Sequence, residues 1–189
     1  MPPTNPVDAV TLLAQRQQML DVPWMLTRSI AAFLYGHNRT TVDIDVILDC
    51  EGLPVARFCA AFEPEYFLDP RMVDDSLRTG MMFNAIPVTG GPKIDFIPLK
   101  REPYQQSAFA RRKVFGWHDT AIPVIAPDDL VLSKLAWAQM PGSERQLAGV
   151  RSIMSMSLFS EDEEYFQHWP GELRPREALD ASRETRYDA

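Results

Sequence analysis

The chain has 189 residues, a formal net charge of −7, and 46% hydrophobic against 24% charged residues. This composition is typical of a globular protein that is long enough to bury one sizeable core. The excess of negative charge argues against general electrostatic adhesion to nucleic acid. No apolar run approaches the roughly 18 residues of a membrane span, and no basic start precedes an apolar signal core, so we expect a cytoplasmic protein without a membrane partner.

The first part of the chain alternates between helical and strand patterns. Apolar residues at helical spacing predict an amphipathic helix from Pro6 to Leu20. The short apolar run from Trp24 to Thr27 predicts a buried strand, and Ser29 to Tyr35 predicts a small helix that Gly36 ends. This order of strand, turn and helix directs a helix N-terminus toward an anion site.

The next apolar segment carries two carboxylates, Asp43 and Asp45, on a predicted strand that ends at Leu48. Residues i and i+2 of a strand share a face, so Ile44 and Val46 are expected in the core and both carboxylates on the opposite side. Like charges this close raise each other's pKa unless a cation intervenes, and such oxygen ligands suit Mg²⁺ bridging a substrate phosphate. A solvated strand edge with two charges facing water is the alternative interpretation.

A third carboxylate follows about 50 residues later. A helix is expected from Pro54 to Ala61. The apolar segments Met81 to Val88 and Lys93 to Leu99 flank a Thr-Gly-Gly-Pro turn and predict a hairpin with Asp95 in its second strand. Three carboxylates on neighbouring strands are able to hold two metal ions for phosphoryl or nucleotidyl transfer. A phosphoesterase-like metal site uses similar ligands and stays open as an alternative.

The last third of the chain changes from strands to helices. Strands are predicted at Lys113 to Trp117 and at Ile122 to Ile125. Helices are predicted from Pro127 to Gln139, from Ser143 to Met154 and from Asp162 to Trp169. Together the patterns predict an α+β protein in which a small helical cap follows the sheet.

These residues resemble a known family, the minimal nucleotidyltransferases of the DNA polymerase β-like superfamily, and within it the AbiEii-type, toxin–antitoxin-linked branch of small bacterial proteins. That family has a strand, a G-G or G-S turn, an Ala-containing helix, a Y/H-G-x-x-R-x-T segment, an h-D-h-D strand and a later h-D-h strand. The helical segment that begins at Ile125 is also similar to that branch, so the resemblance covers nearly the whole chain. The matching positions here are Trp24 to Thr27, Arg28-Ser29, Ile30 to Tyr35, Gly36, Arg39, Thr41, Asp43, Asp45 and Asp95.

The resemblance implies a nucleotidyltransferase-like mixed β-sheet flanked by helices, with a C-terminal helical cap. Residues 1–126 would form the catalytic domain and residues 127–180 the cap. Residues 181–189, which are rich in Arg, Glu and Asp, are expected to form a frayed tail.

The implied activity is Mg²⁺-dependent transfer of a nucleotide from an NTP onto a hydroxyl of RNA, including a tRNA end, or of a protein. The enzyme would be of toxin type, with a cognate antitoxin as partner. Asp43, Asp45 and Asp95 would be catalytic and would hold two Mg²⁺ ions, with Asp95 helping to remove the acceptor proton. The residues implied in nucleotide binding are Ser29, Arg28, Arg39 and Lys134.

Each of these binding residues also has an ordinary structural interpretation. Ser29 caps a helix or donates to a phosphate, roles that share one geometry. Arg39 binds phosphate or pairs with a nearby carboxylate, and Lys134 contacts phosphates or lies on the surface. Basic residues that follow Asp95 form a patch that binds RNA or the NTP tail, or they belong to a solvated face. These residues are Lys100, Arg101, Arg111, Arg112 and Lys113.

Two positions depart from the family pattern. Arg28 stands where the family has a turn Gly that lets the backbone approach the triphosphate. Its guanidinium either fills part of the nucleotide site or replaces the lost backbone contacts with a charge-assisted pair to phosphate. In the first case the chain is a catalytically impaired nucleotidyltransferase fold that acts as a binding or regulatory partner. Gly149 stands where relatives carry an acidic residue, and this change is expected to alter helix packing or the surroundings of the metal site.

Overall fold

The computed structural model describes residues 2–37, 43–138, 144–155 and 163–169. None of the helices in these ranges is long and apolar enough to cross a membrane. The strands are β1 (Trp24–Leu26), β2 (Ile44–Leu48), β3 (Tyr66–Phe67), β4 (Phe83–Pro87), β5 (Ile94–Pro98), β6 (Lys113–Trp117) and β7 (Thr120–Val124). The helices are α1 (Pro6–Leu20), α2 (Arg28–Leu34), α3 (Val55–Phe62), α4 (Pro70–Thr79), α5 (Pro103–Ala110), α6 (Pro127–Ala138), α7 (Glu144–Met154) and α8 (Glu163–His168).

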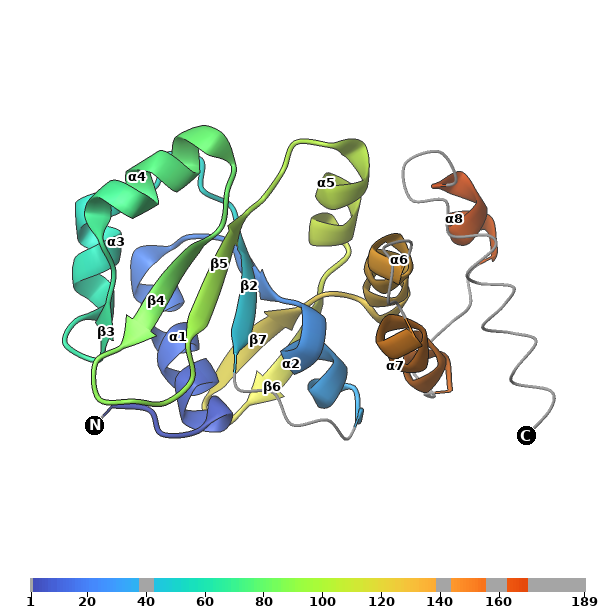
Figure 1. Cartoon of the computed structure of the whole chain (residues 1–189), viewed down its shortest axis with the longest axis horizontal. Helices are drawn as coiled ribbons and strands as arrows, with labels where there is room; N and C mark the ends of the chain where they lie inside the picture. Colours follow the sequence, from blue (N-terminus) through green and yellow to red (C-terminus); the bar gives the residue numbers. More distant parts are fainter. Residues whose placement is uncertain (1, 38–42, 139–143, 156–162, 170–189) are drawn as a thin grey trace. The chain divides into compact units, whose positions relative to one another are not determined.

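The strands form one mixed sheet in the order β3-β4-β5-β2-β1-β7-β6 (Figure 1). The pairs β2–β5 and β1–β7 are parallel, and the other neighbouring pairs are antiparallel. The predicted hairpin is confirmed, because β4 and β5 pair directly across the Gly-rich turn. The sheet and its helices confirm the expected α+β class.

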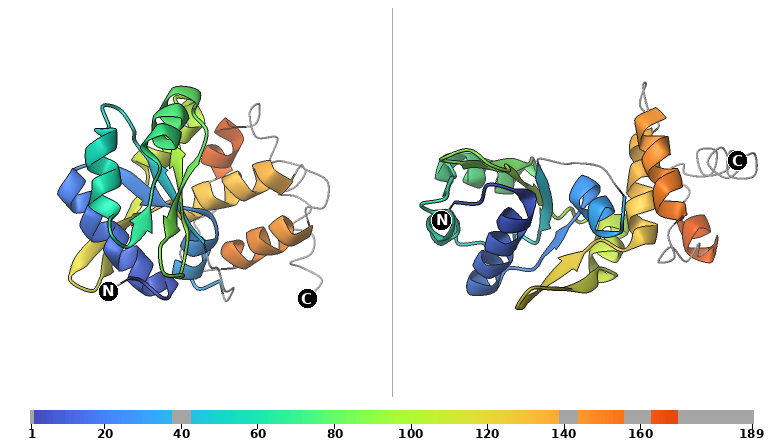
Figure 2. Two further views of the ribbon diagram at one scale, coloured as in Figure 1. Left: turned by 60° about the vertical axis from the view of Figure 1, so that its left-hand side comes forward. Right: turned by 90° about the horizontal axis from the view of Figure 1, so that it is seen from below.

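Helices α1 and α3 lie side by side on one face of the sheet (Figures 1 and 2). The α1 helix turns Val10, Leu13 and Leu20 into the core at helical spacing. Asn5 caps the N-terminus of this helix, because its side chain accepts a hydrogen bond from the backbone N–H of Asp8 at 3.0 Å. Burying this face of α1 leaves the opposite face of the sheet for polar side chains.

Aromatic side chains pack together on the helix-covered face of the central strands. Phe58 and Phe62 of α3 pack on Phe96 of β5 with ring centroids 5.2 and 5.4 Å apart, and Phe83 of β4 stacks on Phe96 at 5.2 Å. All four rings are almost fully buried. Because side chains alternate along a strand, the residue before Phe96, which is Asp95, points to the other face.

Most predicted elements are present, but three were missed. The prediction named no helix at α4 or α5 and no strand at β3. Asp69 caps α4 by accepting from the backbone N–H of Arg71 at 2.9 Å, and Gly80 ends it with a φ of 71°. Apolar periodicity did not reveal α4 because only Val73 and Ser76 of this helix are buried.

The chain divides into two compact units, residues 1–30 with 40–125 and residues 31–39 with 126–189. The first unit contains the whole sheet with α1, α3, α4 and α5. In the second unit α6 packs against α7, and His37 Nδ1 lies 2.7 Å from Ser152 Oγ. Residues 31–39 thus belong to the helical unit, whereas the sequence-based boundary assigned them to the catalytic domain.

We expect Phe96→Ala to lower the free energy of unfolding by about 3–5 kcal/mol, because it leaves a cavity among three other rings. Chemical denaturation monitored by circular dichroism measures this change. Phe67→Ala is the matched control, since Phe67 is 61% exposed, and it should cost less than about 1 kcal/mol. Equal losses in the two variants would contradict the role given to the aromatic cluster.

Candidate active site

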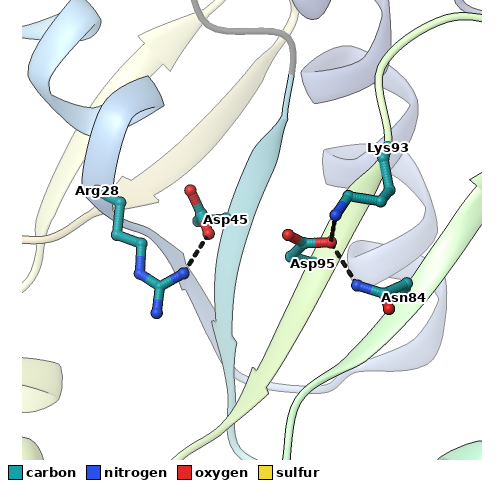
Figure 3. Close-up of polar contacts among 5 residues, drawn as sticks. All are labelled: Arg28, Asp45, Asn84, Lys93 and Asp95. Carbon is teal, nitrogen blue, oxygen red and sulfur yellow. Dashed lines mark hydrogen bonds and ion pairs between the residues drawn. The ribbon is translucent and has the colours of Figure 1, made fainter.

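A row of polar side chains crosses three adjacent strands on the face opposite the aromatic cluster. Asp45 of β2 and Asp95 of β5 are direct register partners, and Asp95 is also the partner of Asn84 in β4. Register partners on neighbouring strands carry their side chains on the same face, within contact distance. Figure 3 shows the three side chains on one side of the sheet.

The β2 strand presents Asp45 to this face because the residues on either side of it belong to the core. Ile44, Val46 and Leu48 are completely buried. The backbone is fixed on both sides, since the N–H of Ile44 donates to Lys93 O at 2.9 Å and that of Thr27 donates to Asp45 O at 3.0 Å. The Asp45 carboxylate is therefore held in place by the sheet itself.

Asp43 immediately precedes β2 and is exposed. It lies near enough to Asp45 to act on it electrostatically. The expected burial of Ile44 and Val46 with both carboxylates away from the core is thus what the structure has. Val42, which belongs to the same predicted pattern, lies outside the described residues.

Arg28 forms an ion pair with Asp45. Its Nη1 donates to Asp45 Oδ1 at 2.8 Å, and the Arg28 side chain is 37% exposed against 9% for that of Asp45. The backbone of Arg28 has a φ of 53°, in the left-handed region that glycine adopts without cost. A non-glycine residue in this region stores about 1–3 kcal/mol of strain, which is common at functional sites. The turn keeps the conformation expected of a glycine there, yet presents a guanidinium to the carboxylate.

Asp95 is held by two donors, neither of which was predicted from the sequence. Lys93 Nζ lies 3.0 Å from Asp95 Oδ1, and Asn84 Nδ2 donates to the same oxygen. Lys93 precedes Asp95 by two residues on an extended segment, so this spacing alone was a signal that the two side chains share a face. The contribution of Asn84 depends on the pairing of β4 with β5, which the sequence does not specify residue by residue.

Burial and neighbouring charges shift the pKa values of two side chains in the row. The pKa of Asp45 is raised, first by burial and then by the charges of Asp95 and Asp43, although Arg28 acts in the opposite direction. The pKa of Lys93 is raised, first by its hydrogen bond to Asp95, although burial acts to lower it. Two cationic side chains thus face three carboxylates, and the carboxylates still repel one another.

Asp45 and Asp95 suit Mg²⁺ by the chemistry of their oxygen atoms and by their register, but both already have cationic partners. Carboxylate oxygens are the ligands that Mg²⁺ prefers, and Asp45 and Asp95 lie side by side. As they stand, no three acidic, His or Cys side chains in the described part of the chain gather closely enough to hold an ion. Arg28 and Lys93 occupy carboxylate oxygens of the pair. An ion that bound Oδ1 of Asp45 or Oδ1 of Asp95 would have to compete with these contacts.

The structure describes two of the remaining predicted binding residues, Ser29 and Lys134. Ser29 lies half-buried in the first turn of α2, next to Arg28. Lys134 belongs to α6 in the second unit, where its Nζ would lie 3.4 Å from a Cβ added at Gly149. The glycine therefore leaves room for the lysine side chain. Arg39 lies outside the described residues.

The structure describes contacts or strand positions for three of the basic residues after Asp95. Arg101 Nη2 lies 3.4 Å from Glu51 Oε2, where both side chains are largely exposed. Arg112 donates to the carbonyl of Phe109 and its guanidinium carbon lies 4.4 Å from the centroid of that ring. Lys113 begins β6, which lies at the sheet edge remote from β4 and β5.

We expect Arg28→Gln to raise the pKa of Asp45 further, because Arg28 favours its charged form by Coulomb attraction and by a hydrogen bond. A pH titration of the carboxyl ¹³C resonance measures this. Since the folded pKa already lies above the unfolded one, ionisation of Asp45 costs stability as the pH rises through the folded pKa, and the variant should extend that loss to higher pH. Arg101→Gln is the control, and an Asp45 pKa that is unchanged in Arg28→Gln would refute the ion pair.

No family model and no curated protein matches the sequence of this chain. Solved structures match its fold. The antigenic nucleotidyltransferase-like protein from Paracoccidioides brasiliensis has a TM-score of 0.51 at 14% identity, covering 93% of this chain and 90% of that chain. The structure of ANT(2″)-Ia in complex with adenylyl-2″-tobramycin has a TM-score of 0.54 at 14% identity, covering 86% and 94%. The solution structure of ANT(2″)-Ia has the same TM-score and identity and covers 97% of both chains. The chain therefore has the nucleotidyltransferase-like fold.

Proposed function

We propose that the chain is an Mg²⁺-dependent nucleotidyltransferase that moves a nucleotide from an NTP onto an acceptor hydroxyl. The observation that carries this proposal is the register pairing of Asp45 with Asp95 on the face of the sheet opposite the aromatic cluster. The nucleotidyltransferase-like fold supports the reaction class. Asp43, Asp45 and Asp95 are the proposed catalytic and metal-binding residues.

The finer parts of the proposal depend on the resemblance of the sequence to the AbiEii-type branch. They are a toxin-type role in the cytoplasm, an RNA, tRNA-end or protein hydroxyl as acceptor, and a cognate antitoxin as partner. Ser29, Arg28, Arg39 and Lys134 are the proposed nucleotide-binding residues, and residues 127–180 the proposed cap.

In this mechanism the protein side chains position the reactants and handle the proton. Asp95 accepts the proton of the acceptor hydroxyl as its oxygen bonds to the α-phosphorus, and pyrophosphate leaves as the α–β bridging bond breaks. Asp43, Asp45 and Asp95 would hold the metal, which would supply positive charge to the phosphate oxygens. Asn84 keeps the Asp95 carboxylate in place on the sheet. Catalysis of this kind depends on positioning and electrostatic stabilisation.

Asp43→Ala should fold normally yet lose nucleotide transfer by at least about 100-fold, because a metal ligand contributes several kcal/mol to transition-state stabilisation. The assay incubates the protein with Mg²⁺, each labelled NTP in turn, and total cellular RNA and protein. Asp75→Ala is the control, since Asp75 is an exposed acidic residue that pairs with Arg78 on α4. Transfer retained by Asp43→Ala would end the metal hypothesis.

A second candidate function is supported by the ion pair between Arg28 and Asp45. If this contact persists, the guanidinium competes with a metal ion for the Asp45 carboxylate and occupies space next to the turn. The protein would then use the fold to bind a partner, without catalysis. Both candidates agree with the fold, and they differ in nucleotide affinity.

This second candidate predicts that Arg28→Gly binds NTP about tenfold more tightly, because the substitution removes an obstacle and relieves the strained backbone. Isothermal titration calorimetry with each NTP and Mg²⁺ measures the affinity. Weaker binding in the variant contradicts obstruction and makes Arg28 a phosphate ligand. Arg101→Gly serves as the control for loss of an exposed, ion-paired arginine.

A further inference from the structure

Exposed apolar side chains gather at one edge of the sheet. Single exposed apolar residues are normal on a protein surface, whereas a contiguous patch of them marks a binding site. Of the ten large hydrophobic side chains that are exposed in the described residues, six lie between residues 67 and 88. They come from β3, α4, β4 and the residues that flank β4. These six are Phe67, Met72, Met81, Met82, Ile86 and Val88.

Strand register places Phe67 and Ile86 on the same face as the polar row. Side chains alternate along β4, so Ile86 shares a face with Asn84, whose amide donates to Asp95. Phe67 of β3 is the register partner of Ile86, and register partners share a face. Tyr66 points the other way, since it is 1% exposed and its ring lies 6.5 Å from an aromatic ring of α3. Phe67 and Ile86 are 61% and 45% exposed.

Two further apolar residues extend this surface along β4. Met82 directly precedes the strand and Val88 directly follows it, both in phase with Ile86. The backbone N–H of Val88 donates to Glu65 O at 3.0 Å, so the pairing with β3 continues there. A methionine side chain adapts to the shape of a bound group. The apolar strip, as we use the term, consists of Phe67, Met82, Ile86 and Val88.

The apolar strip lies next to the carboxylate that would take the acceptor proton. Asn84 is the register partner of Asp95 (Figure 3), so Ile86 is a diagonal neighbour of Asp95, at about 7–8 Å. Phe67 lies one strand further out, and neighbouring strands are about 4.8 Å apart. A molecule whose hydroxyl meets Asp95 would therefore place a body of one or two rings over Ile86 and Phe67.

The charges around the strip favour an uncharged molecule. The four side chains of the strip carry no charge, and Lys93, the cation beside Asp95, is already paired with that carboxylate at 3.0 Å. An RNA acceptor requires cationic side chains for its phosphates, and the net charge of −7 opposes its approach. An apolar body gains free energy when it and the strip leave water together. The strip is therefore complementary to a neutral, apolar group.

We propose that the acceptor is a small, uncharged molecule whose apolar body packs on the apolar strip while its hydroxyl reaches Asp95. This inference depends on the proposed nucleotidyl transfer, and it replaces the RNA or protein hydroxyl implied by the family resemblance. Phe67 and Ile86 then select the acceptor by its shape and lack of charge. In the transfer the acceptor oxygen bonds to the α-phosphorus, its proton passes to Asp95, and pyrophosphate leaves with the electrons of the broken α–β bridging bond.

The first measurement is binding to the strip, which needs neither a metal ion nor turnover. The probe is 2-naphthol, an uncharged bicyclic phenol, titrated into protein with ¹³C-labelled methionine and isoleucine methyl groups. We expect saturable shifts at Met82 and Ile86, and a Kd about tenfold higher in Phe67→Ser, because an aromatic contact is lost. Val114→Ser is the control, since it removes an exposed apolar side chain from β6 at the other edge of the sheet. Its Kd should be unchanged.

The second measurement is transfer, with Mg²⁺ and each labelled NTP in turn. The acceptors are three separate cell fractions: small molecules extracted into organic solvent, RNA, and protein. We expect a new labelled product of low mass with the small-molecule fraction alone. In Phe67→Ser the amount of this fraction needed for half-maximal rate should rise about tenfold, while the KM for NTP stays unchanged, because the residue contacts only the acceptor.

The outcomes separate this inference from the proposed function. Label that appears in RNA or protein alone would overturn the acceptor class and leave nucleotidyl transfer standing. The inference also fails if 2-naphthol causes no saturable shift at Met82 and Ile86, or if Phe67→Ser, with its circular dichroism spectrum intact, binds it as the unmodified chain does. No label in any fraction would overturn the proposed function, and the inference with it. A labelled small molecule together with weaker binding by Phe67→Ser supports both.

Discussion

The alignment of β2 with β5 is the constraint on which the rest of the site depends. Their parallel register sets Asp45 beside Asp95, and a slip of one residue would turn one carboxylate into the core. The aromatic cluster around Phe96 resists such a slip, because moving this ring to the open face would expose it to water. Two adjacent carboxylates with low exposure are unfavourable unless cations balance them. In this fold, positive charges close to Asp45 and Asp95 therefore stabilise the ionised carboxylates.

Side chains of the protein itself supply part of this stabilisation. Lys93 and Asn84 hold Asp95 from β5 and β4, whereas Arg28 reaches Asp45 from a strained turn. The raised pKa of Asp45 shows that Arg28 does not fully offset burial and the neighbouring charges.

The sequence predicted the parts of the molecule that depend on local pattern. Apolar alternation around Asp45 and Asp95 located both strands, and the Gly-rich turn before Lys93 located the hairpin. The ion pairs were not predicted, because Arg28 and Lys93 find their partners through strand register and an unusual backbone angle. Helix α4 was missed for another reason: its signal lies in the Asp69 cap and Gly80 end rather than in an apolar stripe. The placement of Arg39 lies outside the described residues.

The most direct test of the account is whether NTP binding requires both Mg²⁺ and the Asp45 carboxylate. Equilibrium binding of each labelled NTP is measured for the unmodified chain and for Asp45→Asn, with Mg²⁺ and with EDTA. The account predicts binding by the unmodified chain in Mg²⁺ only, and at least about tenfold weaker binding by Asp45→Asn, since a lost metal ligand removes more than 1.4 kcal/mol. Equal binding in EDTA, or unchanged binding by Asp45→Asn, would contradict a metal–nucleotide site at these carboxylates.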